Sequence, residues 1–187
     1  MITKYFKILF LLIPASFILS NCSGTHEPAS FVNPFTGTDA HGHTYPGATL
    51  PFGMVQLSPQ TRLTGWDGCS GYHYTDSVIY GFAHTALNGT GVSDYGDILV
   101  MPYIGTPVFD NNQYSSAFDK RSEFAQPAYY RVKLDKPGVI AEMTATPRVG
   151  YHRYTFPESE LSNIIIDLQH RDRVTDSQIE ILNDREI

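Results

Sequence analysis

The only tryptophan of the chain lies in a turn that is rich in glycine and polar residues. Trp66 occurs in the sequence Gly65-Trp66-Asp67-Gly68-Cys69, and a further glycine stands at position 71. Glycines permit tight turns and a close approach of a ligand to the backbone. Sugar rings stack their C–H faces on aromatic side chains, while fixed polar groups bind their hydroxyls. The turn is therefore either a platform for a polyhydroxylated ligand or a buried indole packed in a β-sandwich core.

A second candidate is the histidine pair His41 and His43, which alternates along the chain with Asp39. Alternate side chains of an extended backbone face the same side, so two imidazoles and one carboxylate would lie together. Zn²⁺ accepts both kinds of ligand. A His-x-His pair without a third ligand at an established spacing is a weak indication of a metal site. We therefore predict a hydrogen-bonded loop here and no metal site.

His84 begins a third polar segment, which also carries Asp94 and Asp97. A histidine near two acids suggests acid–base chemistry. Glycoside hydrolysis needs two carboxylates at a defined separation, and the sequence cannot place these aspartates against each other or against Asp67. Turn and capping roles are the favoured interpretation. The chain has no nucleophile elbow, no glycine-rich phosphate loop and no Cys/His zinc spacing.

The elements that position these residues are predicted to be strands. Short apolar or alternating runs recur between clusters of Gly, Pro, Asn and Asp, and helical periodicity is scarce. The predicted fold is all-β, an antiparallel β-sandwich that is incomplete at its C-terminus. The predicted strands cover residues 54–57, 78–82, 98–103, 129–134, 139–144, 151–156 and 164–168.

Some segments carry more specific expectations. Residues 129–134 alternate, which predicts one buried and one solvent face, whereas the continuous apolar run 164–166 predicts a strand buried on both sides. Residues 107–119 are predicted to form a surface loop, and residues 135–138 a turn. Residues 177–182 begin another alternating strand, which indicates that the chain is part of a longer protein.

The first residues predict export. Residues 1–21 have the pattern of a signal peptide, with Lys4 and Lys7 before an apolar run that is too short to span a bilayer stably. Cys22 stands where a bacterial lipoprotein is acylated, and ordinary secretory cleavage is the alternative. A lipid on Cys22 would anchor the protein to a membrane surface, with residues 22–31 as a tether. We expect an exported lipoprotein, on the periplasmic side of its membrane.

The length and the charge of the chain limit the functions that it can have. Residues 22–187 suffice for one domain with a hydrophobic core. Subtracting the two leader lysines from the 13 basic residues leaves 11 against 19 acidic residues, a balance of −8 that disfavours nucleic-acid binding. A lipidated Cys22 leaves Cys69 without a partner. A fold held together by disulfides is excluded. For Cys69, the role of a small buried residue is favoured over that of a catalytic thiol.

Longer motifs add a resemblance to a known family. They read VNPFTGTDAHGHTYPGATLPFGMVQLSP, then GWDGCSGYHY, then GFAHT, followed by SDYGD and ILVMP. In these motifs the chain, from about Val32 onward, resembles the N-terminal region of glycoside hydrolase family 92, the bacterial exo-acting α-mannosidases. The resemblance implies an N-terminal β-sandwich packed on a C-terminal (α/α)6 barrel, with the active site at their junction. It also implies calcium-dependent, inverting hydrolysis of α-mannosides of glycans.

The resemblance further implies how the roles divide between the two domains. The general acid, the general base and the Ca²⁺ ligands come from the barrel, so no catalytic or metal residue is assigned here and this chain alone is expected to be inactive. The sandwich is expected to contribute Trp66 for stacking and Asp67 and Cys69 for polar contacts, with Gly68 in the same turn. His84 is expected near the domain junction.

Four positions depart from the family pattern, and one of them is Thr36, where isoleucine is usual. Ala86 stands where a second histidine is usual, and Asn88 and Val92 stand where serine and cysteine are usual. If Ala86 replaces a histidine that contacts the ligand, the preferred glycosidic linkage changes. The rival hypothesis is a non-catalytic carbohydrate-binding β-sandwich lipoprotein, complete as it stands, which predicts that the folded chain binds mannosides.

Overall fold

The structure is a computed structural model that describes residues 27–89 and 91–187. The chain divides into two compact units, Met1–Phe31 and Val32–Ile187. In the first unit, Pro28–Phe31 form the 3₁₀ helix η1. The predicted signal peptide and the lipidation site at Cys22 lie outside the described residues. Within the described ranges, no helix is long and apolar enough to cross a membrane.

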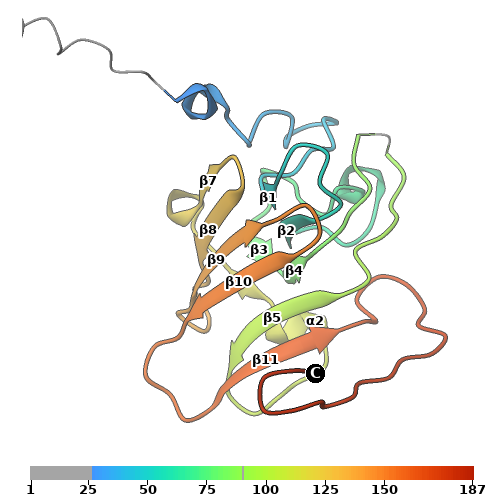
Figure 1. Cartoon of the computed structure of the whole chain (residues 1–187), viewed down its shortest axis with the longest axis vertical. Helices are drawn as coiled ribbons and strands as arrows, with labels where there is room; N and C mark the ends of the chain where they lie inside the picture. The colour runs from blue at the N-terminus through green and yellow to red at the C-terminus, as the bar shows by residue number, and fades with distance from the viewer. Residues whose placement is uncertain (1–26, 90) are drawn as a thin grey trace, which may run out of the picture. The chain divides into compact units, whose positions relative to one another are not determined.

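Antiparallel sheets make up the second unit (Figure 1). In spatial order, the larger sheet contains β1 (Ala48–Thr49), β2 (Gln56–Gln60), β4 (Gly81–Ala83), β5 (Leu99–Ile104) and β11 (Ser162–Asp167). The smaller sheet contains β10 (Gly150–Thr155), β9 (Ile140–Ala145), β8 (Tyr129–Lys133) and β7 (Phe124–Gln126). A ribbon pairs β3 (Val78–Ile79) with β6 (Ser116–Ala117). The short helices are η2 (Trp66–Gly68), α2 (Asn111–Tyr114) and η3 (Lys120–Ser122).

Strand β8 shows why the two sheets pack face to face. Tyr130 and Val132 are fully buried, while Arg131 and Lys133 between them are exposed. Burying one such apolar side chain contributes about 1.5–3 kcal/mol to folding. The inward side chains of both sheets form one core cluster, which from the larger sheet includes Leu57, Phe82, Leu99 and Met101. The predicted antiparallel sandwich and the predicted alternation of residues 129–134 are therefore confirmed.

Strand β11 is less buried than its sequence predicts. Ile165 faces the core, but the side chains of Ile164 and Ile166 are 48% and 40% exposed. β11 is the last strand of the larger sheet and pairs with β5 alone among the described strands. One face of β11 therefore meets the core and the other lies open. The prediction of a strand buried on both sides is wrong for this chain.

The segment 107–119 is more ordered than the predicted surface loop. Asp110 accepts a hydrogen bond from the backbone N–H of Asn112 at 3.0 Å. This N-cap satisfies a free donor at the start of α2, and β6 follows after Ser115. The loop prediction holds for residues 107–110 and is wrong for 111–114 and 116–117, because a capped turn needs only one well-placed aspartate.

Of two further sequence predictions, one is confirmed and one is not. The turn predicted over residues 135–138 is confirmed: the N–H of Leu134 donates to the carbonyl of Val139 at 2.9 Å, and Gly138 has a φ of 68°. The strand predicted over residues 177–182 is not formed. A strand needs a neighbour for its backbone hydrogen bonds, and none of the described strands pairs with this segment.

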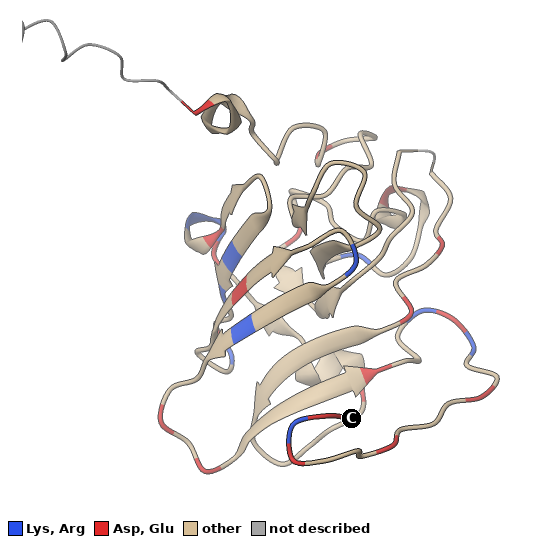
Figure 2. Cartoon of the chain, viewed as in Figure 1, with Lys and Arg blue, Asp and Glu red and all other residues tan. Residues whose placement is uncertain are grey.

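Positive and negative side chains are interspersed along the described residues (Figure 2). On the smaller sheet, Glu142 lies in cross-strand register with both Arg131 and Arg153. Arg153 donates two hydrogen bonds to the Glu142 carboxylate, at 2.8 and 2.7 Å. These bonds, and a third from Tyr129, lower the pKa of Glu142 to about 2. The charges on this sheet are therefore paired locally.

Candidate functional site

The Trp66 turn lies on the surface of the described chain. Gly65 has a φ of 82°, a left-handed conformation that glycine adopts without steric cost, and η2 begins at the next residue. The side chain of Trp66 is 56% exposed. A core indole would be almost fully buried, so the alternative interpretation of Trp66 as a core residue is wrong.

Although it is exposed, the indole of Trp66 has close neighbours. The ring centroid of His41 lies 5.0 Å away, and that of His43 lies 4.5 Å away with an interplanar angle of 89°. Gly91 also approaches the indole: a Cβ atom built at this glycine would lie 1.8 Å from Nε1 of Trp66. The ring is therefore held between the His41–His43 loop and the backbone of Gly91.

Asp67 is joined to both histidines. Its Oδ1 atom lies 2.7 Å from Nδ1 of His41 and 3.1 Å from Nε2 of His43, where imidazole N–H groups can donate to it. Hydrogen bonds to a carboxylate stabilise its charged form. The hydrogen bond from His41, followed by that from His43, lowers the pKa of Asp67 below its usual value. Beside the exposed indole there is thus an ionised carboxylate.

The loop that carries the histidines is held in shape by its backbone. A Cβ atom at Gly42 would lie 2.0 Å from the carbonyl oxygen of Gly37, so only glycine allows this approach. His43 itself has a φ of 52°, which is uncommon for residues other than glycine. In this conformation the buried ring of His43, only 5% exposed, lies under the turn. The carboxylate that meets the histidines is Asp67 and not the predicted Asp39, which lies 3.8 Å from Nε2 of His73.

Cys69 and Gly68 lie beneath the surface of the turn. The thiol of Cys69 is free and the residue is 0% exposed, in agreement with the predicted small buried residue. The polar contact with the substrate that the resemblance implies for Cys69 stays a prediction. Gly68 is buried as well, and its N–H donates to the carbonyl of Gly65 at 3.1 Å. Both residues therefore belong to the buried side of the turn, opposite the exposed indole.

His84 lies between the sheets. It follows β4 of the larger sheet, and its Nε2 atom is 3.0 Å from Nε2 of His152 on β10 of the smaller sheet. Nδ1 of His152 is hydrogen-bonded to the hydroxyl of Tyr154 at 2.7 Å. Burial lowers the pKa of His84, and burial together with His84 lowers that of His152 to about 4. The His84 ring thus contacts His152 on the opposite sheet.

A groove adjoins the site through the segment that follows His84. The N–H of Gly89 donates to the carbonyl of His43 at 2.9 Å, and Asn88 donates to the Gln56 side chain at 2.8 Å. Asp94 accepts a hydrogen bond from the N–H of the next residue at 2.8 Å. The groove has a volume of about 580 Å³ and is lined by Met54, Gln56, Thr85, Ala86, Leu87, Asn88, Tyr95 and Asp97.

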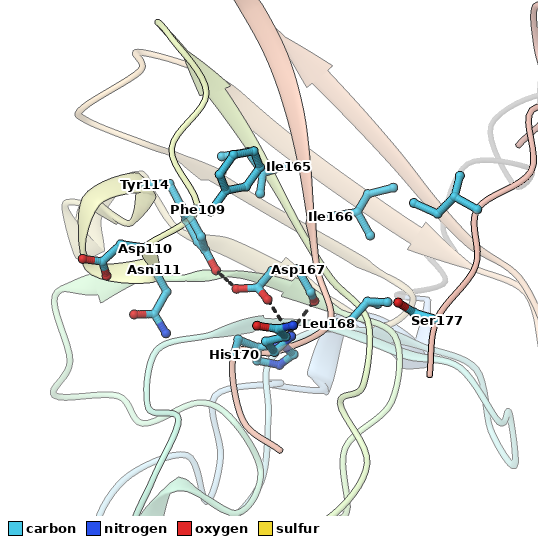
Figure 3. A pocket seen from close by; sticks show the side chains of 12 residues that line it. Phe109, Asp110, Asn111, Tyr114, Ile165, Ile166, Asp167, Leu168, His170 and Ser177 are labelled. Carbon is cyan, nitrogen blue, oxygen red and sulfur yellow. Dashed lines mark hydrogen bonds between the residues drawn. The ribbon is translucent and has the colours of Figure 1, made fainter. Parts of the chain in front are cut away.

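Another hollow of similar volume, about 580 Å³, lies between α2 and β11 (Figure 3). Here the hydroxyl of Tyr114 donates to the carboxylate of Asp167 at 2.5 Å, and the ring of His170 contacts the carbonyl of Asp167. Exposed Phe109 and Ile166 line the same hollow. None of the residues predicted from the sequence as site residues lies in it.

Comparisons with known proteins show the family of the chain. The model of the glycosyl hydrolase family 92 N-terminal domain matches residues 31–187. The chain belongs to glycosyl hydrolase family 92. A family 92 α-mannosidase of Bacteroides thetaiotaomicron, solved with mannoimidazole, is 42% identical with a TM-score of 0.73, over 76% of this chain and 20% of that one. A family 92 inverting mannosidase of the same organism is 32% identical with a TM-score of 0.68, over 78% and 20% of the two chains.

A curated relative of this family 92 chain is an uncharacterized secreted glycosidase of Arthroderma benhamiae. It is 28% identical over 178 residues, which cover 88% of this chain and 22% of the relative. The chain therefore spans about a fifth of the length of the relatives it matches.

The calcium ion that the family resemblance implies does not fit the residues described here. Ca²⁺ takes six to eight oxygen ligands. Within the described ranges, the one group of three or more possible metal ligands is His41, His43 and Asp67, and two of its three members offer nitrogen. No step of a reaction is assigned to calcium in this domain.

Gly91 allows a test of how the indole of Trp66 is held in place. In Gly91→Ala the new methyl group would collide with the indole nitrogen, so Trp66 must move. We expect a shift of the Trp66 fluorescence maximum and a loss of about 1 kcal/mol in the free energy of unfolding, because alanine is strained at a φ of 78°. Emission spectra and urea denaturation of the two proteins measure both effects.

Gly89→Ala is the matched control. Gly89 has a similar φ of 89°, but a Cβ atom there meets nothing within 4 Å. It should lose comparable stability while the emission of Trp66 stays unchanged. Identical spectra of Gly91→Ala and the parent protein would contradict the contact between Gly91 and the indole.

Proposed function

We propose that the protein to which this chain belongs is an exo-acting α-mannosidase that inverts the anomeric centre, and that this domain forms one wall of its sugar pocket. The observation that carries the proposal is the exposed indole of Trp66 beside the ionised carboxylate of Asp67. Two related family 92 structures are those of mannosidases, one of them described as inverting.

The two side chains would divide the recognition of a mannose residue between them. The indole face of Trp66 offers an apolar surface for the C–H groups of the sugar ring. Both histidine contacts of Asp67 use Oδ1. Its second oxygen, Oδ2, remains for sugar hydroxyls, and hydrogen bonds to a charged acceptor are stronger than neutral ones. Asp67 would therefore orient the sugar that Trp66 binds.

The groove next to the turn would receive the part of the glycan beyond that mannose. Asn88 and Gln56, already hydrogen-bonded to each other, offer an amide donor and acceptor at its surface. Ala86 lines the groove without a polar group, and this departure from the family pattern would alter the preferred linkage. In this proposal the general acid, the general base and the Ca²⁺ ligands come from a C-terminal (α/α)6 domain, so this chain binds and orients the substrate only.

Export and anchoring belong to the same proposal. The signal-peptide pattern of residues 1–21 supports export, and the related Arthroderma protein is described as secreted. A lipid on Cys22 would hold the enzyme at a membrane surface, on the periplasmic side. Labelling the expressed protein with a radioactive fatty acid, with Cys22→Ser as the unlabelled control, tests the anchor.

The activity is tested with the full-length protein in the presence of Ca²⁺. It should hydrolyse an aryl α-mannoside, and proton NMR should show β-mannose as the first product. An aryl β-mannoside and an aryl α-glucoside serve as controls and should remain intact. Release of α-mannose first would contradict inversion. Binding of mannoside without any hydrolysis would instead support the non-catalytic sugar-binding lipoprotein.

A further inference from the structure

The tertiary structure supplies the third ligand that the His-x-His sequence lacks. His41 and His43 come from one loop and Asp67 from another, and their ligand atoms all lie within 4.8 Å of one another. We propose that His41, His43 and Asp67 form a binding site for a divalent transition-metal ion, with Zn²⁺ as the preferred occupant. This site is separate from the calcium site implied for the catalytic domain, and it does not depend on the proposed hydrolytic activity.

The spacing of the three groups suits a zinc ion after small side-chain movements. Zinc–nitrogen and zinc–oxygen bonds of about 2.0–2.2 Å in a tetrahedron place neighbouring ligand atoms about 3.4 Å apart. Asp67 Oδ1 now lies 2.7 Å from His41 Nδ1 and 3.1 Å from His43 Nε2. Both separations must open by less than an ångström, and the two imidazole nitrogens, which lie within 4.8 Å of each other, must reach the same spacing. The imidazole of His41 is largely exposed and can turn to accommodate this.

The ion would replace hydrogen bonds without requiring the loss of protons from neutral imidazoles. A neutral histidine carries its proton on one ring nitrogen and a lone pair on the other. In the metal-free arrangement Nδ1 of His41 and Nε2 of His43 point at the carboxylate. Moving each proton to the opposite ring nitrogen would turn both facing atoms into ligands. Asp67 supplies the carboxylate oxygen that both imidazole nitrogens already face.

The ligand set also favours transition-metal ions over calcium and magnesium. Imidazole nitrogen suits zinc, copper and nickel, whereas calcium and magnesium require oxygen ligands. Three protein ligands at a surface leave a fourth position for water, the arrangement of open zinc sites. The burial of His43 and the contact of both histidine rings with Trp66 fix the geometry from one side.

The single tryptophan makes the site measurable. Because both histidine rings contact Trp66, an ion bound between them should change its fluorescence. The 187-residue chain, freed of metal with a chelator that is then removed, is titrated with Zn²⁺ while emission and heat are recorded. We expect a saturable change with one ion per chain. Co²⁺ should bind at the same site and show visible absorption bands of a four-coordinate ion.

Variants separate this site from adventitious binding. His41→Ala changes an exposed side chain and should weaken Zn²⁺ binding at least tenfold, and Asp67→Asn should do the same. Asp39→Asn, which changes an exposed carboxylate two residues from His41 but outside the cluster, should bind Zn²⁺ within twofold of the parent chain. Circular dichroism confirms that each variant is folded.

Three results would overturn the proposal. One is the absence of a saturable zinc-dependent signal from the folded parent chain. Another is equal affinity of the parent chain and His41→Ala. The third is equally tight binding of Ca²⁺, which would exclude ligation by imidazoles.

Discussion

Replacing Trp66 by alanine in the full-length protein should lower kcat/KM for an aryl α-mannoside by roughly 5- to 150-fold. This corresponds to a loss of about 1–3 kcal/mol of stacking and apolar contact with the sugar. The indole is exposed in the described chain, so the substitution removes ligand contact without opening a core cavity. Initial rates at substrate concentrations well below KM give kcat/KM directly.

Two further variants make the result for Trp66 specific. Trp66→Phe retains an aromatic face and should recover part of the lost efficiency. Tyr151→Ala removes another exposed aromatic side chain, on β10, and should stay within twofold of the parent enzyme. Thermal unfolding of each protein confirms that it is folded. Unchanged efficiency of Trp66→Ala would show that the indole does not contact the substrate.

Acidification should destabilise the sandwich through His84 and His152. In the unfolded chain each imidazole binds a proton near pH 6.5, whereas in the folded protein burial and the neighbouring His84 lower the pKa of His152 to about 4. Between these values the unfolded state binds more protons. The contribution of the neutral pair is therefore complete above pH 6.5, and it is lost as the pH falls toward 4.

The expected loss from His152 is up to about 3 kcal/mol, at 1.36 kcal/mol for each unit of pKa difference. Urea denaturation at pH 7.5, 6, 5 and 4 measures it. Carboxylates also titrate in this range, so His152→Gln is the control, and its free energy of unfolding should fall less steeply with pH. Equal slopes for the two proteins would show that the buried pair does not control the acid sensitivity.

Local sequence patterns predicted most of the strands because side-chain alternation is a local property. In β8 the polar and apolar residues alternate, and the structure buries the apolar ones. The same logic failed where burial depends on a neighbour. The run Ile164–Ile166 reads as a strand buried on both sides, but whether the second face of a strand is covered is decided by segments that are distant in the sequence. Asp110 shows a second limit, since one capping side chain converts a loop into a helical turn.

The sequence by itself determined the all-β class, the polar turn around Trp66 as a candidate site, and the motifs of the family. Only the tertiary structure decided which side chains meet. It places Asp67 against histidines 24 and 26 residues away, and His84 against a histidine 68 residues away. The physical reason is that such contacts arise from the packing of two sheets and the closure of loops between them. Close backbone contacts, such as that of Gly42 with the carbonyl of Gly37, set the direction in which the side chains of a loop point. No local sequence pattern predicts that direction.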